Sequence, residues 1–198
     1  LDREVLEREG PRVWFVLNTL NPDIAFGGYQ AAFEMMKAVV RSGREIGVIV
    51  TEDALSDKEY FAYRKNDPEL VEAILASPLV NHRRRQESLA LHPDDDFACY
   101  WVWDRWSTRD LVARTRRGRA FLVAQEYEPV FYDHASHRAM AVEGYGLPHV
   151  PIFNSDLLRA YFEANRIGVF AGGARPAEGV DFHVFEHVAA KLKAGGKG

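Results

Sequence analysis

The residue types best suited to chemistry follow one apolar run in the middle of the chain. After residues 119–125 (RAFLVAQ) come Glu126 and Glu128, with Tyr127 between them and Tyr132 a few positions on. Carboxylates accept protons and hydroxyl hydrogen bonds, and aromatic faces stack on sugars or bases. A short apolar run before them is typical of a buried strand. The segment predicts a catalytic or binding loop at a strand end; the alternative is an aromatic packing turn with solvated acids.

Two other strand ends carry candidate residues. Asp104 follows the apolar run at residues 97–103 (FACYWVW), where it is either a site carboxylate or a surface partner of the next arginine. Gly27 and Gly28 precede an apolar helix. Glycine lets a backbone approach a ligand closely, and a helix N-terminus favours an anion such as a diphosphate. The glycine pair predicts either an anion site or simply a tight turn into the helix.

Several motifs that would define other chemistries are missing or incomplete. Ala31 and Ala32 stand where the dinucleotide fingerprint G-x-G-x-x-G would place another glycine. Glu52 and Asp53 therefore favour an acidic loop over a ribose site. The sequence has no P-loop and no G-x-S-x-G elbow. Residues 183–187 (HVFEH) match the H-x-x-E-H pattern of some zinc peptidases, but no further ligand follows, so we expect no metal site.

The overall composition is that of an average globular protein. Of the 198 residues, 47% are apolar and 27% charged, and the net charge of −4 argues against a nucleic-acid partner. The single cysteine, Cys99, excludes an internal disulfide, and we expect it in the core. The sequence has no apolar run long enough to span a membrane and no signal-peptide pattern at its start. We expect a cytoplasmic protein, and peripheral association with a membrane stays open.

The elements that must position these residues alternate between strand and helix. An apolar stripe that begins at Tyr29 and ends at Val40 predicts a helix between apolar strands at residues 12–17 and 46–50. Such a βαβ unit makes its two strands parallel. Further strands are predicted at residues 97–103, 119–125, 149–153 and 167–171, and further helices at residues 67–76, 107–117, 133–143 and 156–165. The alternation predicts an α/β fold with a Rossmann-like, doubly wound, mostly parallel sheet and helices on both faces.

Two segments resemble a known family. Residues 121–132 (FLVAQEYEPVFY) resemble the F-V-Q-D-Y-E-P-x-F-Y stretch of bacterial rhamnosyltransferases that build surface polysaccharides and S-layer glycans. Glu126 stands where that pattern usually has aspartate. Residues 152–158 (IFNSDLL) resemble the N-S-x-x-L segment of the same family. These enzymes have the GT-B fold, in which two Rossmann-like halves face a cleft, and the similarity runs over most of the chain.

The resemblance implies an N-terminal, acceptor-binding half of such an enzyme. Residues 12–182 would form this domain, between a helical extension at residues 1–11 and a helix or linker at residues 183–198 that leads toward a second domain. The second domain would bind the donor. The reaction implied is transfer of a hexosyl group, in particular rhamnosyl, from a dTDP-type nucleotide sugar to a glycan. The nucleotide sugar is a substrate, and no cofactor is expected.

The resemblance also assigns roles to individual residues. Gly27 and Gly28 would lie near the donor diphosphate. The acceptor side would be lined by Glu126, Tyr127, Glu128 and Tyr132, and Asn154 and Ser155 would join them as substrate-binding residues. Glu126 would take the acceptor proton, with Glu128 or Asp104 as the alternative bases.

Two other functions stay open from the sequence. One is a non-catalytic carbohydrate-binding module that uses the same aromatic loop. The other is a nucleotide-dependent oxidoreductase, which the incomplete glycine fingerprint disfavours.

Overall fold

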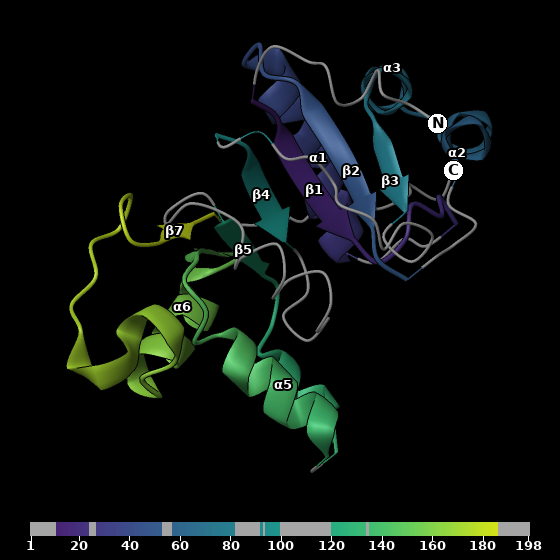
Figure 1. Cartoon of the computed structure of the whole chain (residues 1–198). Coiled ribbons are helices and arrows are strands. Elements are labelled where there is room, and N and C mark those ends of the chain that lie inside the picture. Colours follow the sequence, from purple (N-terminus) through teal and green to yellow (C-terminus); the bar gives the residue numbers. More distant parts are fainter. Residues whose placement is uncertain are drawn as a thin grey trace, which may run out of the picture.

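The chain folds around one parallel sheet. A computed structural model describes residues 11–23, 27–52, 57–81, 92, 94–99, 120–133 and 135–185. Seven strands form the sheet in the order β3-β2-β1-β4-β5-β6-β7, and every strand pair is parallel (Figure 1). The strands are β1 Val13–Leu17, β2 Ile46–Val50, β3 Leu79–Asn81, β4 Asp96–Cys99, β5 Ala120–Ala124, β6 Val150–Phe153 and β7 His183–Val184. The predicted α/β fold with a doubly wound parallel sheet is confirmed.

The order of the strands reverses between β1 and β4. From β1 the chain builds outward through β2 to β3, and it then returns to place β4 on the other side of β1. In open α/β sheets, ligands bind outside the carboxyl ends of the strands at such a reversal. The fold therefore directs attention to the loops that follow β1, β2, β4, β5 and β6.

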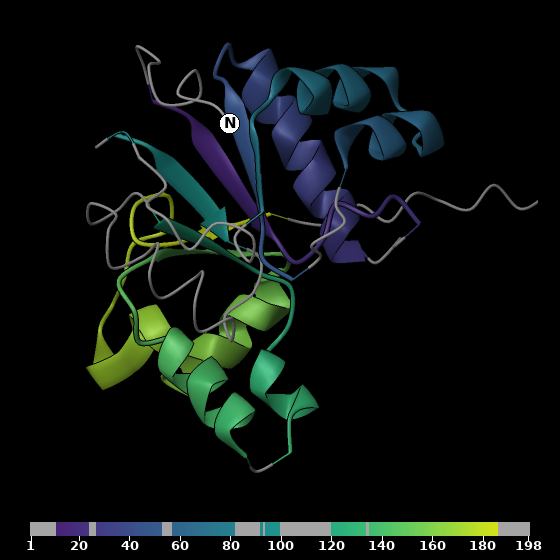
Figure 2. The same cartoon turned by 45° about the vertical axis from the view of Figure 1, so that its right-hand side comes forward.

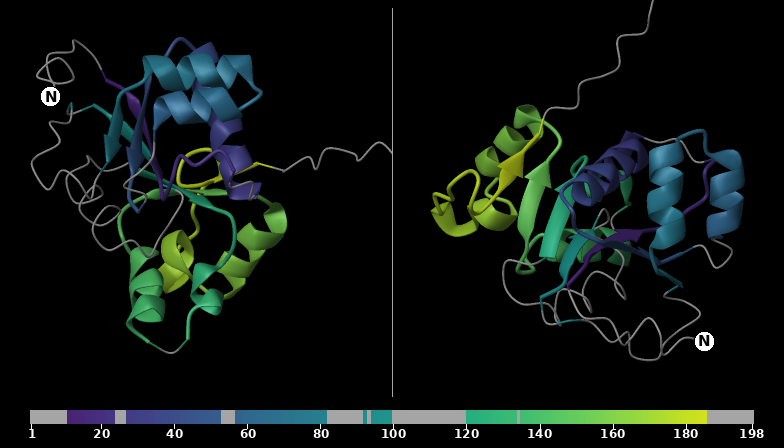
Figure 3. Two further views of the ribbon diagram at one scale, coloured as in Figure 1. Left: turned by 90° about the vertical axis from the view of Figure 1, so that its right-hand side faces the viewer. Right: turned by 90° about the horizontal axis from the view of Figure 1, so that it is seen from above.

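Helices cover both faces of the sheet. On one face lie α1 (Gly27–Arg41), α2 (Lys58–Arg64) and α3 (Pro68–Ala76); on the other lie α5 (Ser136–Gly144), α6 (Asp156–Ala164) and the 3₁₀ helix η3 (Gly168–Gly173) (Figures 2 and 3). Alternate residues of β1 divide between the two cores, because successive strand side chains point to opposite faces. Phe15 packs with the first set of helices, and Trp14 and Val16 pack on the second face.

The helix boundaries follow the capping signals in the sequence. The Asp67 carboxylate accepts the backbone N–H of Leu70 at 3.2 Å, and Pro68 occupies the first turn of α3. The Ser155 hydroxyl accepts the N–H of Leu158 at 3.2 Å and so caps α6. After α1, Gly43 adopts φ of 81°, which suits a glycine at the end of a helix. The helices predicted from Tyr29 to Val40, at residues 67–76 and at residues 156–165 are confirmed.

The strand predicted at residues 167–171 is wrong. Glycines 168 and 172 adopt φ of 57° and 67°, which is incompatible with extended backbone, and the segment forms η3. Phe170 of η3 is buried against Phe182, with ring centroids 5.4 Å apart. The last strand is instead β7, so the sheet continues two residues into the segment that we predicted as a helix or linker.

Several other predictions fall wholly or partly outside the described residues. They include the helices predicted at residues 1–11 and 107–117, the end of the strand at 97–103, and Asp104. Within the described ranges, no helix combines the length and the apolar character that crossing a membrane requires.

Candidate functional site

The carboxyl edge of the sheet gathers the loops that follow β1, β2, β5 and β6. Three backbone hydrogen bonds extend the ladder beyond the strands and fix where these loops start. Glu52 N–H donates to the Asn18 carbonyl at 3.0 Å, Thr51 N–H donates to that of Leu17 at 2.9 Å, and Asn154 N–H donates to that of Ala124 at 3.2 Å. These loops, which are far apart in sequence, therefore start at the same edge of the sheet.

Tyr132 is within the electrostatic influence of three carboxylates at this edge. Burial is the main cause that raises the pKa of the Tyr132 phenol, and the negative charges of Glu128, Glu52 and Glu126 raise it further. Glu126 and Glu128 belong to the same segment as Tyr132, whereas the effect of Glu52 requires the loop after β2 to lie near the loop after β5. The phenol therefore keeps its proton at neutral pH and remains a hydrogen-bond donor. The predicted trio Glu126, Glu128 and Tyr132 is brought together, and Glu52 joins it.

The two predicted carboxylates differ in exposure. Glu126 is exposed to solvent, whereas Glu128 is buried in the first turn of the 3₁₀ helix η2 (Glu128–Phe131). A general base must reach the proton that it removes. Glu126 is therefore the carboxylate that an incoming hydroxyl can reach, whereas the Glu128 side chain is buried.

Tyr127 belongs to an aromatic cluster. Its ring stacks on Tyr145 at 5.7 Å and 20° and meets the edge of Phe162 at 5.8 Å. Tyr161 lies against it at 5.4 Å. The ring is therefore held by protein on several sides and fixes the segment after β5, and only its exposed part is left for a sugar.

Gln125 connects three elements of the edge. Its backbone carbonyl accepts Nδ2–H of Asn154 at 2.8 Å, which ties the end of β5 to the loop after β6. A Cβ atom at Gly28 would lie 3.5 Å from Gln125 Cγ, so the start of α1 runs directly beside this side chain. The buried Nε2 of Gln125 has no hydrogen-bond acceptor in the part of the chain that the structure describes.

Most of the predicted site residues lie at this edge of the sheet. Gly28, Asn154, Glu126, Glu128 and Tyr132 all lie at the carboxyl edge, beside or between the loops described above. Gly27 is the first residue of α1 at the same edge. The Ser155 hydroxyl is engaged as the cap of α6 and contacts the Asn154 side chain at 3.3 Å. Asp104 lies outside the described residues.

Sequence reasoning missed Gln125 and Tyr145 and set Glu52 aside. Gln125 carried a usable signal, because it is the first residue after a buried strand. Glu52 is the second residue after β2. Across the described ranges, no group of three or more His, Cys, Asp or Glu residues is placed to hold a metal ion.

A doubly wound parallel sheet with helices on both faces and a helix that starts at a glycine pair defines the class of Rossmann-like α/β domains. A family model described as the WsaF N-terminal domain matches residues 12–156, which is more than two thirds of the chain. The chain belongs to this family, a domain associated with glycosyltransferases. WsaF itself is a rhamnosyltransferase. No curated protein sequence matches the chain.

Proposed function

We propose that this chain is the acceptor-binding N-terminal half of a GT-B glycosyltransferase. The enzyme would transfer a hexosyl group, rhamnosyl by the resemblance of residues 121–132, from a nucleotide sugar to a glycan hydroxyl. One observation carries the proposal. In a chain of a glycosyltransferase-associated family, the loops after two strands, β2 and β5, place Glu52, Glu126 and Glu128 near enough to Tyr132 for their charges to act on its phenol.

The chemistry needs a base at the acceptor hydroxyl. The hydroxyl oxygen forms a bond to the anomeric carbon of the donor, the bond from that carbon to the phosphate oxygen breaks, and the nucleoside diphosphate leaves. The hydroxyl proton passes to a carboxylate. Glu126 suits this role because it is exposed at the strand end. Tyr132 can donate a hydrogen bond to a neighbouring acceptor oxygen.

The start of α1 suits the anionic part of the donor. This helix has 15 residues and no acidic side chain in its first turn. A helix N-terminus carries partial positive charge and directs backbone N–H groups outward along the helix axis, which favours a diphosphate. We therefore place the diphosphate toward Gly27 and Gly28, with the second half of the enzyme holding the nucleotide.

The test is Glu126→Gln in the complete enzyme. The amide keeps the size of the side chain and cannot accept the proton, so we expect kcat to fall by a factor of about 10²–10⁴. The acceptor KM should change little, because the amide still accepts a hydrogen bond. Glu59→Gln, an exposed acid in the first turn of α2, is the matched control and should keep full turnover. If the Glu126→Gln enzyme keeps its wild-type turnover, Glu126 is not the base, and Glu128→Gln is the next variant to test.

A carbohydrate-binding module is the second candidate, and one observation favours it. Phe131 is 62% exposed and follows the acidic segment directly, so its ring is available to a sugar face. This function predicts glycan binding without turnover. If the complete protein binds a glycan and releases no nucleoside diphosphate from any sugar nucleotide, the module replaces the transferase.

A further inference from the structure

One buried hydroxyl joins the backbone on both sides of Tyr127. Tyr145 follows α5 and is 3% exposed. Its hydroxyl accepts the backbone N–H of Glu128 at 3.3 Å and donates to the carbonyl oxygen of Glu126 at 3.4 Å. Both bonds are long, and each is weak on its own. Together they connect the two residues whose carboxylates form the proposed site.

The Tyr145 ring is held firmly enough to make this hydroxyl a fixed point. It stacks on Tyr127 at 5.7 Å and meets Phe162 edge-on at 5.0 Å, so two neighbouring rings restrict it. Burial, and then the charge of Glu128, raises the pKa of the Tyr145 phenol far above its usual value. The hydroxyl therefore keeps its proton and can donate and accept at once.

We propose that Tyr145 is a positioning residue of the transferase site, which orients Glu126 and Glu128 through the backbone of their shared turn. The proposal rests on the proposed function. Tyr145 touches neither substrate nor donor in this scheme. Its hydroxyl sets the peptide groups of Glu126 and Glu128, and these determine where the exposed Glu126 carboxylate stands relative to an acceptor hydroxyl.

The first test is Tyr145→Phe in the complete enzyme. The change removes the hydroxyl and keeps the ring that packs on Tyr127 and Phe162. We expect kcat to fall about tenfold to a hundredfold, because small misplacement of a catalytic group is expensive in rate. The acceptor KM should stay within about twofold, since no binding group is removed. A variant that retains wild-type kcat overturns the proposal.

Tyr161→Phe is the matched control. Tyr161 lies in α6 and is 42% exposed, and its ring centroid is 5.4 Å from that of the same Tyr127. Removing its hydroxyl perturbs the same aromatic cluster without touching the bridge, so kcat should not change. The double variant Glu126→Gln with Tyr145→Phe should be no slower than Glu126→Gln alone, because Tyr145 acts through Glu126. Losses that multiply in the double variant contradict the proposal.

A second measurement does not depend on activity. Hydrogen exchange of the Glu128 amide should become at least about tenfold faster in Tyr145→Phe and stay unchanged in Tyr161→Phe, at a temperature where circular dichroism shows both folded. Unchanged exchange overturns the bridge. If the wild-type enzyme transfers no sugar while the amide exchanges faster, the proposed function fails and the bridge stands. If transfer is normal in Tyr145→Phe, the positioning role fails and the function stands.

Discussion

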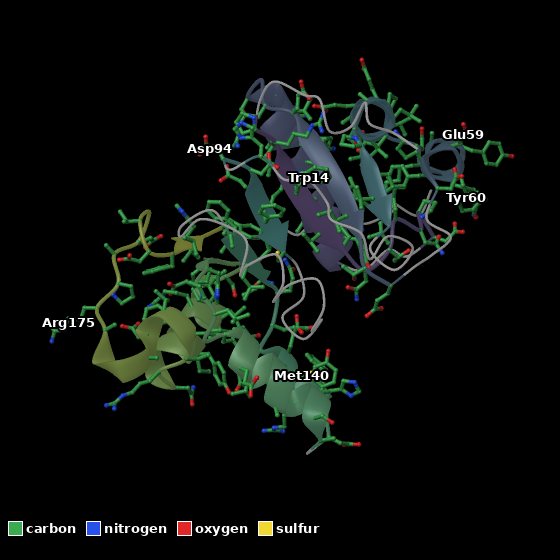
Figure 4. All side chains as sticks on the ribbon, in the orientation of Figure 1. Trp14, Glu59, Tyr60, Asp94, Met140 and Arg175 are labelled. Atoms are coloured by element: carbon green, nitrogen blue, oxygen red, sulfur yellow. The ribbon has the colours of Figure 1, made fainter. Side chains whose placement is uncertain are left out.

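Trp14 shows how single residues fix the sheet that carries the site. Trp14 lies on β1 in the middle of the sheet (Figure 4). Its indole is 2% exposed, and its Nε1–H donates to the Asp95 carboxylate at 2.9 Å. The same carboxylate accepts the backbone N–H of Arg12 at 2.7 Å. On the neighbouring strand, Gly47 lies directly beside Trp14 in register. The glycine leaves the space that the ring fills.

Gly47→Ala should destabilise the protein. A Cβ atom at this position would come within 2.5 Å of two ring carbons of Trp14, so the indole or the strand must shift. We expect a loss of about 1–3 kcal/mol in the free energy of unfolding, measured by urea denaturation. Gly28→Ala is the control, because among the described residues its Cβ would meet Gln125 Cγ at 3.5 Å and Cδ at 3.8 Å, which are ordinary contacts, and alanine favours a helix. A Gly47→Ala protein as stable as the wild type would show that the indole moves without cost.

At the residue scale, the sequence predicted which residues form the candidate site better than it predicted how buried each one is and what lies next to it. Glu126 and Glu128 were identified because they directly follow a buried apolar run. Which of the two is buried depends on η2 and on Tyr145, which arrives from α5, so no local pattern shows it. Glu52 joins the site only through the packing of loops from two distant strands. The buried position of Trp14 depends on the glycine on the neighbouring strand.

Asp67 links two helices and contributes a pH dependence. Its carboxylate caps α3 and accepts Nζ–H of Lys37 from α1 at 2.9 Å. The Lys37 hydrogen bond is the main cause that lowers the pKa of Asp67, and the Leu70 N–H lowers it further. A carboxyl whose pKa is lower in the folded state contributes stability above its unfolded pKa of about 3.9. That contribution is lost as the pH falls through the folded pKa.

Two substitutions at Asp67 separate the cap from the charge. Asp67→Asn keeps a good capping oxygen and loses the ion pair, and Asp67→Ala loses both. At pH 7 the stability order should be wild type, then Asn, then Ala, with about 1 kcal/mol for the cap. The difference between wild type and Asn should shrink in urea denaturation at pH 3. Asp57→Asn is the control, because Asp57 caps α2 through Tyr60 N–H at 2.8 Å without an ion pair in the described structure. If the stability difference between the wild type and Asp67→Asn is the same at pH 7 and pH 3, the ion pair with Lys37 is not its source.

At the element scale, strong local signals were predictive and weak ones were not. The stops and caps of α1, α3 and α6 come from residues that act within one turn. The 3₁₀ helix η3 looked like a strand because its apolar residues are consecutive, and the left-handed backbone of its glycines leaves no hydropathy signal. Strand β7 has only two residues and exists because β6 offers an edge, so its own sequence could not reveal it.

The whole molecule places its candidate site where the sheet reverses. Near-continuous apolar strands that alternate with helices specify a parallel sheet covered on both faces, so the fold class could be predicted. The pairing of β1 with β4 joins segments far apart in sequence, and no local pattern encodes it. The same long-range pairing decides which strand ends become neighbours. Which side chains meet at the carboxyl edge of the sheet therefore depends on the topology as much as on the residue types.

Cys99 offers a probe of this reversal point. It is the last residue of β4, is 2% exposed, and pairs with Val16 of β1 and Leu122 of β5. Because β4 is held on both sides, exposing the thiol should require the sheet to come apart. A thiol reagent should then react about 10⁴-fold or more slowly than with the unfolded chain.

The dependence of that rate on urea distinguishes two kinds of opening. The sequence has a single cysteine, so the reaction reports one site. If exposure needs global unfolding, the logarithm of the rate rises with urea along the slope of the equilibrium transition. The chain unfolded in high urea gives the intrinsic rate. A rate that does not respond to low urea would instead mean that the carboxyl end of β4 opens locally. In that case the edge that carries Glu126 and Tyr132 moves in the native protein, and acceptor binding would have to order it.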